Sequence, residues 1–164
     1  MKFVLPCKEY EQKAIEFIEE FYAHSSPING TGDLDEVLKN GTYSQWLSKI
    51  IKDMDIANIP HDRVPSYTYF FVSEETEQII GMVNIRIALN DFLRNEGGHI
   101  GYSIRPTERK KGYGTQILRD TLEFCKLIGI CDIIISCDKK NQASAKIIKK
   151  CGGILDADPQ SNNF

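Results

Sequence analysis

The sequence lacks the features that would point to nucleic-acid binding or to a membrane. Its 164 residues carry 20 Lys and Arg against 23 Asp and Glu, so the formal net charge is −3. General nucleic-acid binding favours a strongly basic surface, which this composition does not supply. No apolar run approaches the roughly 20 residues that span a bilayer, and the start, Met1–Pro6, is too short for a secretory signal. We therefore expect a cytoplasmic protein that binds neither nucleic acid nor a membrane.

Cysteine pairs at metal-binding or redox spacing are also missing. The 5 cysteines are odd in number and form no C-x-x-C motif. Cys125, Cys131, Cys137 and Cys151 lie in apolar stretches, as buried thiols of a reducing compartment commonly do. We therefore expect reduced cysteines and no metal site.

The most informative stretch that is present is a glycine-spaced basic turn. Residues 109–115, Arg-Lys-Lys-Gly-Tyr-Gly-Thr, follow a predicted strand over 99–104 and precede a predicted helix over 115–128. A turn that opens a helix leaves backbone N–H groups unpaired, and the helix dipole and basic side chains add positive charge there. Because Gly112 and Gly114 have no side chains, a bulky anion can approach the main chain closely. The turn therefore predicts a cradle for a diphosphate.

Three phosphate-binding patterns compete for this turn. The nucleoside-triphosphatase loop G-x-x-x-x-G-K-[ST] is absent from the sequence. The dinucleotide loop G-x-G-x-x-G matches at Gly112 and Gly114 but has Ile117 at its third glycine, although Asp132 lies near the distance expected for its acid. The pattern [QR]-x-x-G-x-[GA] is satisfied at every fixed position, with Arg109 as its first residue. The third pattern fits best, and a dinucleotide-dependent oxidoreductase stays open as a weaker alternative.

With this third pattern the chain resembles the GNAT superfamily of N-acetyltransferases. The resemblance continues downstream, where an apolar run at 131–137 suits a buried strand and residues 141–153 resemble the family's N-x-x-[AS]-x-x-[IL]-x-x-x-x-G segment. Residues 97–106 also resemble one poorly characterised bacterial branch of the superfamily. Strand, glycine turn, helix, strand and asparagine-led helix thus follow the family's order across residues 98–155.

The rest of the pattern predicts a single domain over residues 1–164. A hydrophobic content of 41% is enough for one core. An antiparallel meander followed by βαβ units predicts an α/β (α+β) fold, GNAT-like and three-layered, with a mixed, twisted sheet flanked by about four helices. The further elements expected are strands at 2–5, 67–72 and 78–88, and helices at 8–23 and from Thr42, where Gln45 suits a capping box.

The C-terminus departs from the family's pattern, which normally adds two strands after the asparagine-led helix. Residues 153–157 suit one strand, and residues 158–164 are short and polar. We therefore expect a shortened C-terminal strand region. It leaves a sheet edge that is either open or covered by a second copy in a homodimer.

The resemblance implies acetyl-CoA as the cosubstrate. The N–H groups of the cradle would hold its diphosphate, and the strand before the cradle would pair with the pantetheine arm. A backbone N–H near Ile104 would stabilise the oxyanion that develops at the thioester. Asn141 would hydrogen-bond the arm, cap its helix, or both. The implied cofactor-binding residues are Ser103, Ile104, Arg109, Lys110, Lys111, Gly112, Tyr113, Gly114, Thr115, Asn141 and Ser144.

The implied reaction is direct attack of an amine on the thioester. It needs a base for the amine proton and gains from an acid that protonates the leaving thiolate. Many members carry a tyrosine on the last helix as this acid, but its position here is Ile148, and Cys151 and Cys137 are weak substitutes. The base is equally open. The candidate catalytic residues lie in or just before the strand that precedes the cradle, and they are Tyr102, His99 and Glu96.

The acceptor expected is a primary amine of a small molecule or of an amino-acid-like compound, and protein amines stay open. Its site would be built by the first two helices, their loop and the hairpin. The candidates for it are the acidic residues Asp33, Asp35 and Glu36 and the hairpin residues Tyr67, Tyr69 and Arg86, all of which also suit ordinary surface or packing roles. A catalytically silent acyl-CoA-binding module is the alternative function, which Ile148 and the short C-terminus favour slightly.

Overall fold

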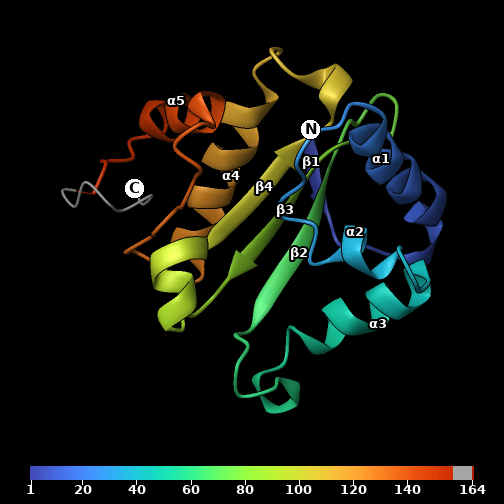
Figure 1. Cartoon of the computed structure of the whole chain (residues 1–164), viewed down its shortest axis with the longest axis horizontal. Helices are drawn as coiled ribbons and strands as arrows, with labels where there is room; N and C mark the ends of the chain where they lie inside the picture. Colours follow the sequence, from blue (N-terminus) through green and yellow to red (C-terminus); the bar gives the residue numbers. More distant parts are fainter. Residues whose placement is uncertain (157–163) are drawn as a thin grey trace.

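A computed structural model describes residues 1–156 and 164 of the chain. One sheet runs through the middle of the molecule, with α1–α3 on one face and α4 and α5 on the other (Figure 1). The strands are β1 (Lys2–Val4), β2 (Ser66–Val72), β3 (Ile79–Arg86) and β4 (Ile100–Ile104). The helices are α1 (Glu11–Ala23), α2 (Leu34–Val37), α3 (Tyr43–Lys52), α4 (Tyr113–Leu127) and α5 (Gln142–Lys150).

The sheet has the order β1-β2-β3-β4, and each neighbouring pair is antiparallel. The predicted hairpin is confirmed as β2 and β3, which are rich in the β-branched and aromatic residues that strands favour. Within the described residues the sheet is therefore antiparallel throughout, where the sequence analysis expected a mixed one. β4 is the last strand, so one of its edges carries no neighbouring strand of the described sheet.

Two hydrophobic cores, one on each face of the sheet, produce the three layers. Along β2, Phe70 and Val72 pack toward α1–α3, whereas Phe71 packs toward α4 and α5, because successive strand residues point to opposite faces. Trp46 of α3 is fully buried in the first core, and Ile148 of α5 is buried in the second. The three-layer fold predicted from the sequence is confirmed.

Local sequence signals set the start of α3. The backbone N–H of Gln45 donates to the Thr42 hydroxyl at 3.3 Å, and the N–H of Thr42 donates to the Gln45 side chain at 2.8 Å. Two of the N–H groups that a helix start leaves unpaired are thereby satisfied. The predicted capping box is confirmed.

The C-terminal third forms fewer strands than the sequence suggests. The run 131–137 forms no strand of the described sheet and meets it at Ile135, through an isolated antiparallel pair with Gly98, and at Ile134, whose carbonyl accepts from the His99 N–H. Ile135 also exchanges two backbone hydrogen bonds of 3.0 Å with Phe164. The strand predicted at 153–157 is not formed over 153–156, and residues 157–163 lie outside the described part of the chain.

None of the helices in the described residues is long and apolar enough to cross a membrane. The cysteines are free, and Cys131 is exposed, contrary to the expectation that it is buried.

Candidate functional site

The glycine turn forms an open cradle of backbone N–H groups at the start of α4. Gly112 is the N-cap of the helix and has φ +90°, a left-handed conformation that glycine adopts without strain. Lys110 is also left-handed, with φ +65°. Among the described residues, no backbone carbonyl accepts a hydrogen bond from the N–H groups of residues 110–114. A Cβ atom built on Gly112 would have no atom within 4 Å, so the space above the turn is free.

Gly114, the second glycine of the turn, is needed for helix packing rather than for an unusual backbone conformation. A Cβ atom on Gly114 would lie 2.7 Å from Cδ1 of Ile147, which belongs to α5. Gly114 thereby lets the first turn of α4 approach α5 closely. Gly112 is thus required by its positive φ and Gly114 by the close packing of α4 on α5. Only Gly112 leaves room for a ligand.

The basic side chains of the turn point in different directions. Lys110 is exposed and forms no ion pair among the described residues, whereas Lys111 pairs with Glu108 at 2.9 Å. Arg109 turns away from the free N–H groups, because its Nε donates to the Ile104 carbonyl at 3.2 Å and its Nη2 donates to the Ser26 hydroxyl at 2.8 Å. The cation of the turn that has no ion-pair partner in the described chain is therefore Lys110.

Along β4, the backbone N–H and C=O groups of alternate residues point to β3 and to the outer edge of the sheet. The N–H of Arg105 donates to Ile80 and the N–H of Arg86 donates to the His99 carbonyl, each at 2.8 Å, so the odd-numbered residues of this strand bond to β3. The backbone of Ser103 is therefore used within the sheet, which corrects its predicted contact with the pantetheine arm. The N–H of Ile104 points to the outer edge, as the predicted oxyanion contact requires.

Tyr102 lies on the α4–α5 face of the sheet. Its hydroxyl is 3.3 Å from the hydroxyl of Ser144 in the first turn of α5. Burial raises the pKa of Tyr102 to about 12, so the phenol is protonated at neutral pH. A protonated phenol donates protons, which makes this side chain unsuited to the role of base and suited to that of acid.

His99 directly precedes β4 and holds the start of that strand to the run 131–137. Its Nδ1 accepts a hydrogen bond from the Ile134 N–H at 3.0 Å, and its own backbone N–H donates to the Ile134 carbonyl at 2.7 Å. Burial lowers the pKa of His99, and repulsion from Arg94 and Arg86 lowers it further. The ring is therefore neutral with its proton on Nε2, and its one basic nitrogen is already occupied.

Glu96 and Asn141 are two further site residues that the sequence predicts. Glu96 is exposed on a π-helical turn, Leu93–Gly97, that precedes β4. Asn141 caps α5, because its side-chain oxygen accepts from the Ser144 N–H at 3.1 Å. Among the described residues nothing accepts a hydrogen bond from the amide nitrogen of Asn141, so this donor is available to a ligand.

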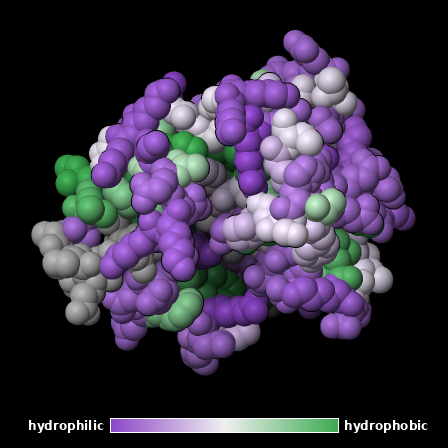
Figure 2. All heavy atoms as spheres, turned by 45° about the horizontal axis from the view of Figure 1, so that its top comes forward, coloured by the Kyte–Doolittle hydropathy of each residue, from purple (hydrophilic) through white to green (hydrophobic). Residues whose placement is uncertain are grey.

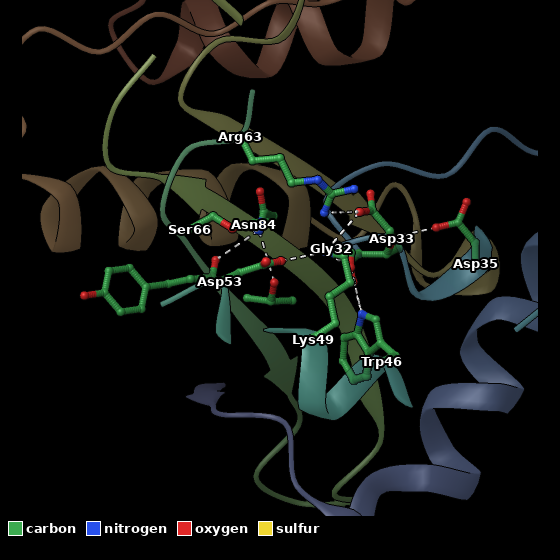
Figure 3. A network of polar contacts seen from close by, with 12 residues as sticks. Gly32, Asp33, Asp35, Trp46, Lys49, Asp53, Arg63, Ser66 and Asn84 are labelled. Carbon is green, nitrogen blue, oxygen red and sulfur yellow. Dashed lines mark hydrogen bonds and ion pairs between the residues drawn. The ribbon is translucent and has the colours of Figure 1, made fainter. Parts of the chain in front are cut away.

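The predicted acceptor residues are only partly brought together. Asp33 has φ +69° and pairs with Lys49 at 3.0 Å and with Arg63 at 3.6 Å (Figure 3). Arg86 donates to the carbonyls of Gly97 and Gly98 at 3.1 and 3.0 Å, and burial lowers its pKa although Asp33 opposes this.

The other four acceptor candidates have different surroundings. Asp35 accepts from the Thr31 hydroxyl, Glu36 pairs with Lys39, and neither carboxylate is free. Tyr69 packs against Phe3 and Phe124 in the α4 layer, so it cannot line a site on the α1–α3 face. Tyr67 is half-buried in β2, and its carbonyl faces the buried amide of Asn84.

A buried ion pair beside the cradle was missed by the sequence analysis. Arg105 is 4% exposed and donates to Glu20 of α1 at 2.7 Å. The other Glu20 oxygen accepts from the N–H of Thr107 at 2.9 Å and from its hydroxyl at 2.8 Å. Glu20 and Arg105 are 85 residues apart, so no local pattern in the sequence signals the pair. Figure 2 shows the face of the molecule on this side, where polar residues surround a hollow with apolar atoms at its floor.

The comparisons with known proteins agree with this geometry. Residues 20–154 match the family described as acetyltransferase (GNAT) domain. A ribosomal-protein-S5-alanine acetyltransferase from Vibrio fischeri superposes with a TM-score of 0.66 at 17% identity, over 93% of this chain and 78% of that one. A Vibrio cholerae protein provisionally described as a ribosomal-protein-serine acetyltransferase superposes with a TM-score of 0.62 at 19% identity, over 92% of this chain and 78% of that one. No protein of curated function matches the sequence.

The dinucleotide-binding alternative is wrong, because it requires a parallel sheet with the glycine loop after its first strand. Here the loop follows the last strand of an antiparallel sheet. The domain match spans most of the chain, and the solved structures share its fold. The chain therefore belongs to the GNAT acetyltransferases, whose cosubstrate is acetyl-CoA.

Proposed function

We propose that this protein transfers the acetyl group of acetyl-CoA to a primary amine of a small or amino-acid-like molecule. The observation that carries the proposal is the row of free N–H groups at residues 110–114, opening α4 directly after β4. Unpaired N–H groups at a helix start, reinforced by the helix dipole, favour a phosphate oxygen as their acceptor.

The residues of the cradle fit a diphosphate. The space above Gly112 is open, and the exposed Lys110, two residues earlier in the same turn, supplies a positive charge. The outward N–H of Ile104 lies on β4 just before the cradle, and the amide nitrogen of Asn141 supplies a second donor at the start of α5. When bound, acetyl-CoA supplies the activated acyl group, and these residues of the chain orient it.

The N–H of Ile104 is assigned the role of oxyanion donor. Charge develops on the thioester oxygen during attack, and a fixed backbone donor stabilises that charge without reorganisation. Glu96 is assigned the role of base, because it is the only one of the three candidates that carries a carboxylate and it is exposed. His99 is assigned a structural role, since its basic nitrogen holds Ile134.

Tyr102 is assigned the role of acid, in place of the tyrosine that α5 lacks at Ile148. Its phenol is protonated at neutral pH and lies against α5 through Ser144. We expect Tyr102→Phe to lower kcat about 100-fold while leaving the KM for acetyl-CoA near its wild-type value, because only proton donation to the thiolate is lost. Steady-state kinetics with a thiol-release assay measures both constants. An unchanged kcat would show that solvent or another group protonates the thiolate.

The proposal of a small acceptor is supported by the loop after α1, residues 24–33, which lies against β4 and limits the space beside it. A Cβ atom on Gly30 would lie 2.2 Å from the Gly101 carbonyl oxygen, so this loop rests directly on the strand. A panel of small amines, amino acids and peptides with free N-termini tests the proposal. Thiol release with small amines and not with peptides supports it, and the reverse result assigns a protein acceptor, as the names of the two solved relatives suggest for them.

A silent acyl-CoA-binding module is the second candidate, favoured by Ile148. Calorimetry with CoA separates the two. Micromolar binding without turnover on any member of the panel assigns the module, whereas binding with turnover assigns the enzyme. No binding of CoA by the pure protein contradicts both.

A further inference from the structure

We propose that Arg109 is a positioning residue that clamps the loop after α1, residues 24–33, to the phosphate cradle, so that binding of CoA orders the acceptor side of the site. This inference rests on the proposed function. The family motif by itself would make Arg109 a phosphate contact, and its hydrogen bonds in this chain lie elsewhere.

Arg109 joins two regions that are far apart in the sequence, the end of β4 and the end of α1 with the loop that follows it. Its Nε donates to the carbonyl of Ile104 at the end of β4, and its Nη2 donates to the hydroxyl of Ser26 in the loop. Its guanidinium carbon lies 5.3 Å from the ring centre of Phe21 in the last turns of α1, a cation–π distance. Since guanidinium donors are held in a rigid plane, these contacts fix the position of the loop relative to the strand.

A second arginine ties the same end of α1 to the same connection between β4 and α4. Arg105 pairs with Glu20, and Glu20 also accepts two hydrogen bonds from Thr107. The guanidinium carbon of Arg105 lies 5.5 Å from the ring centre of Phe17. The end of α1 and the segment that leads into the cradle are therefore held together at two points, of which only Arg109 reaches the loop itself.

The clamped loop reaches the middle of β4. The hydroxyl of Ser103 donates to the carbonyl of Asn29 at 2.7 Å, and Gly30 packs against Gly101. Ser25 and Asp33, at the two ends of the loop, have φ +47° and +69°, which are costly for residues other than glycine and need surrounding contacts to persist. The loop is thus a strained wall of the acceptor side, held by Arg109 and Ser103 and, at its α2 end, by the Nε1–H of Trp46, which donates to the carbonyls of Thr31 and Gly32.

Coupling follows from the position of Arg109 next to the cradle. An anion that accepts from the N–H groups of residues 110–114 fixes the backbone that begins at Arg109, and thereby fixes the guanidinium that holds Ser26. Because coupling between two sites is reciprocal, an ordered loop also strengthens CoA binding. Coupling free energies of this kind commonly change an affinity about 5- to 150-fold.

Hydrogen exchange of the full chain, with and without CoA, tests the clamp without requiring turnover. In the wild type we expect CoA to slow exchange both at 109–115 and at 24–33, the latter by at least about fivefold. Ser26→Ala removes only the hydroxyl that meets Arg109, so it should keep the protection at 109–115 and lose most of that at 24–33. Arg109→Gln should do the same. Ser44→Ala, on the exposed face of α3, is the matched control and should behave as the wild type.

Steady-state kinetics distinguish a positioning role of Arg109 from a general effect on stability, because only the positioning role predicts a change in the KM for the acceptor. Ser26→Ala should raise the KM for the acceptor at least about fivefold and leave the KM for acetyl-CoA within about twofold. The salt dependence of CoA affinity should fall in Lys110→Gln and stay unchanged in Arg109→Gln, because only a cation close to the phosphates contributes an attraction that salt screens.

The outcomes separate the inference from the function on which it rests. Protection at 109–115 without protection at 24–33 in the wild type overturns the clamp and leaves CoA binding intact. A Ser26→Ala variant that matches Ser44→Ala also overturns it, as does a loss of salt dependence in Arg109→Gln. Protection at neither segment overturns the proposed function and the clamp together.

Discussion

At the scale of single residues, the cradle depends on one backbone conformation. Gly112 and Gly129 both have strongly positive φ, +90° and +85°, and a Cβ atom on either would meet nothing within 4 Å. The two glycines therefore carry the same conformational requirement at opposite ends of α4. Only Gly112 lies among the free N–H groups. Comparing substitutions at the two glycines therefore separates the loss of stability caused by backbone strain from the loss of CoA affinity.

We expect Gly112→Ala and Gly129→Ala to lower the free energy of unfolding by a similar amount, about 1 kcal/mol each, because alanine is strained at positive φ. Only Gly112→Ala should weaken CoA binding, since the methyl group enters the space above the cradle. Urea denaturation and calorimetry measure the two effects. Equal CoA affinities of the two variants would contradict the assignment of the cradle.

His99 is a titratable residue whose ring nitrogen holds the run 131–137 through the Ile134 N–H. Its pKa is lowered by burial, so the unfolded chain binds more protons than the folded chain below about pH 6.5. Its stabilising contribution is therefore complete above that pH and is lost as the pH falls through the lowered pKa. We expect the free energy of unfolding to decline between pH 7.5 and 5.5 and the decline to be smaller in His99→Asn. The exposed His61→Asn variant is the control and should keep the decline.

At the scale of elements, local signals predict the helices and the hairpin well. The capping box of α3, the hairpin β2–β3 and the asparagine cap of α5 follow from residues within a few positions of one another. The run 131–137 shows the limit of such signals. Its composition suits a strand, but a strand needs a ladder of partners, and among the described residues the run meets the sheet through the isolated pair Gly98–Ile135 instead.

The start of α5 allows the two roles of Asn141 to be separated. We expect Asn141→Ala to lower the free energy of unfolding by about 1 kcal/mol, because the N-cap is lost, and to weaken CoA binding. Asn141→Ser keeps a capping oxygen and removes the amide nitrogen, so stability should be retained while CoA binding still falls. Thermal unfolding and calorimetry test this, and unchanged binding in both variants would leave Asn141 as a cap alone.

At the scale of the whole molecule, the α1–α3 layer is joined to the cradle by the pair of Glu20 and Arg105. Burial opposes the charge of Glu20, but the Thr107 N–H and Arg105 outweigh it and lower the pKa of this carboxyl. The charged pair therefore stabilises the fold above the unfolded pKa of about 4.5, and this contribution is lost as the pH falls.

We expect Glu20→Gln to lower the free energy of unfolding by about 2–3 kcal/mol at pH 7, because it leaves Arg105 buried without its counter-ion. Glu123→Gln removes an exposed ion pair with Lys126 at 3.0 Å and should cost less than about 1 kcal/mol. Urea denaturation compares the two. Similar losses would mean that the Glu20 pair is no more than a surface contact.

The sequence by itself determined the family, the glycine turn that opens α4 and the hairpin β2–β3, because these depend on residue type and on short spacings. Only the tertiary structure decided that Arg109 faces Ser26 and that the backbone of Ser103 is used by β3. It also decided that Nδ1 of His99 is occupied by Ile134. The reason is physical: where a side chain or carbonyl points is set by strand register and by partners that lie far away in the sequence.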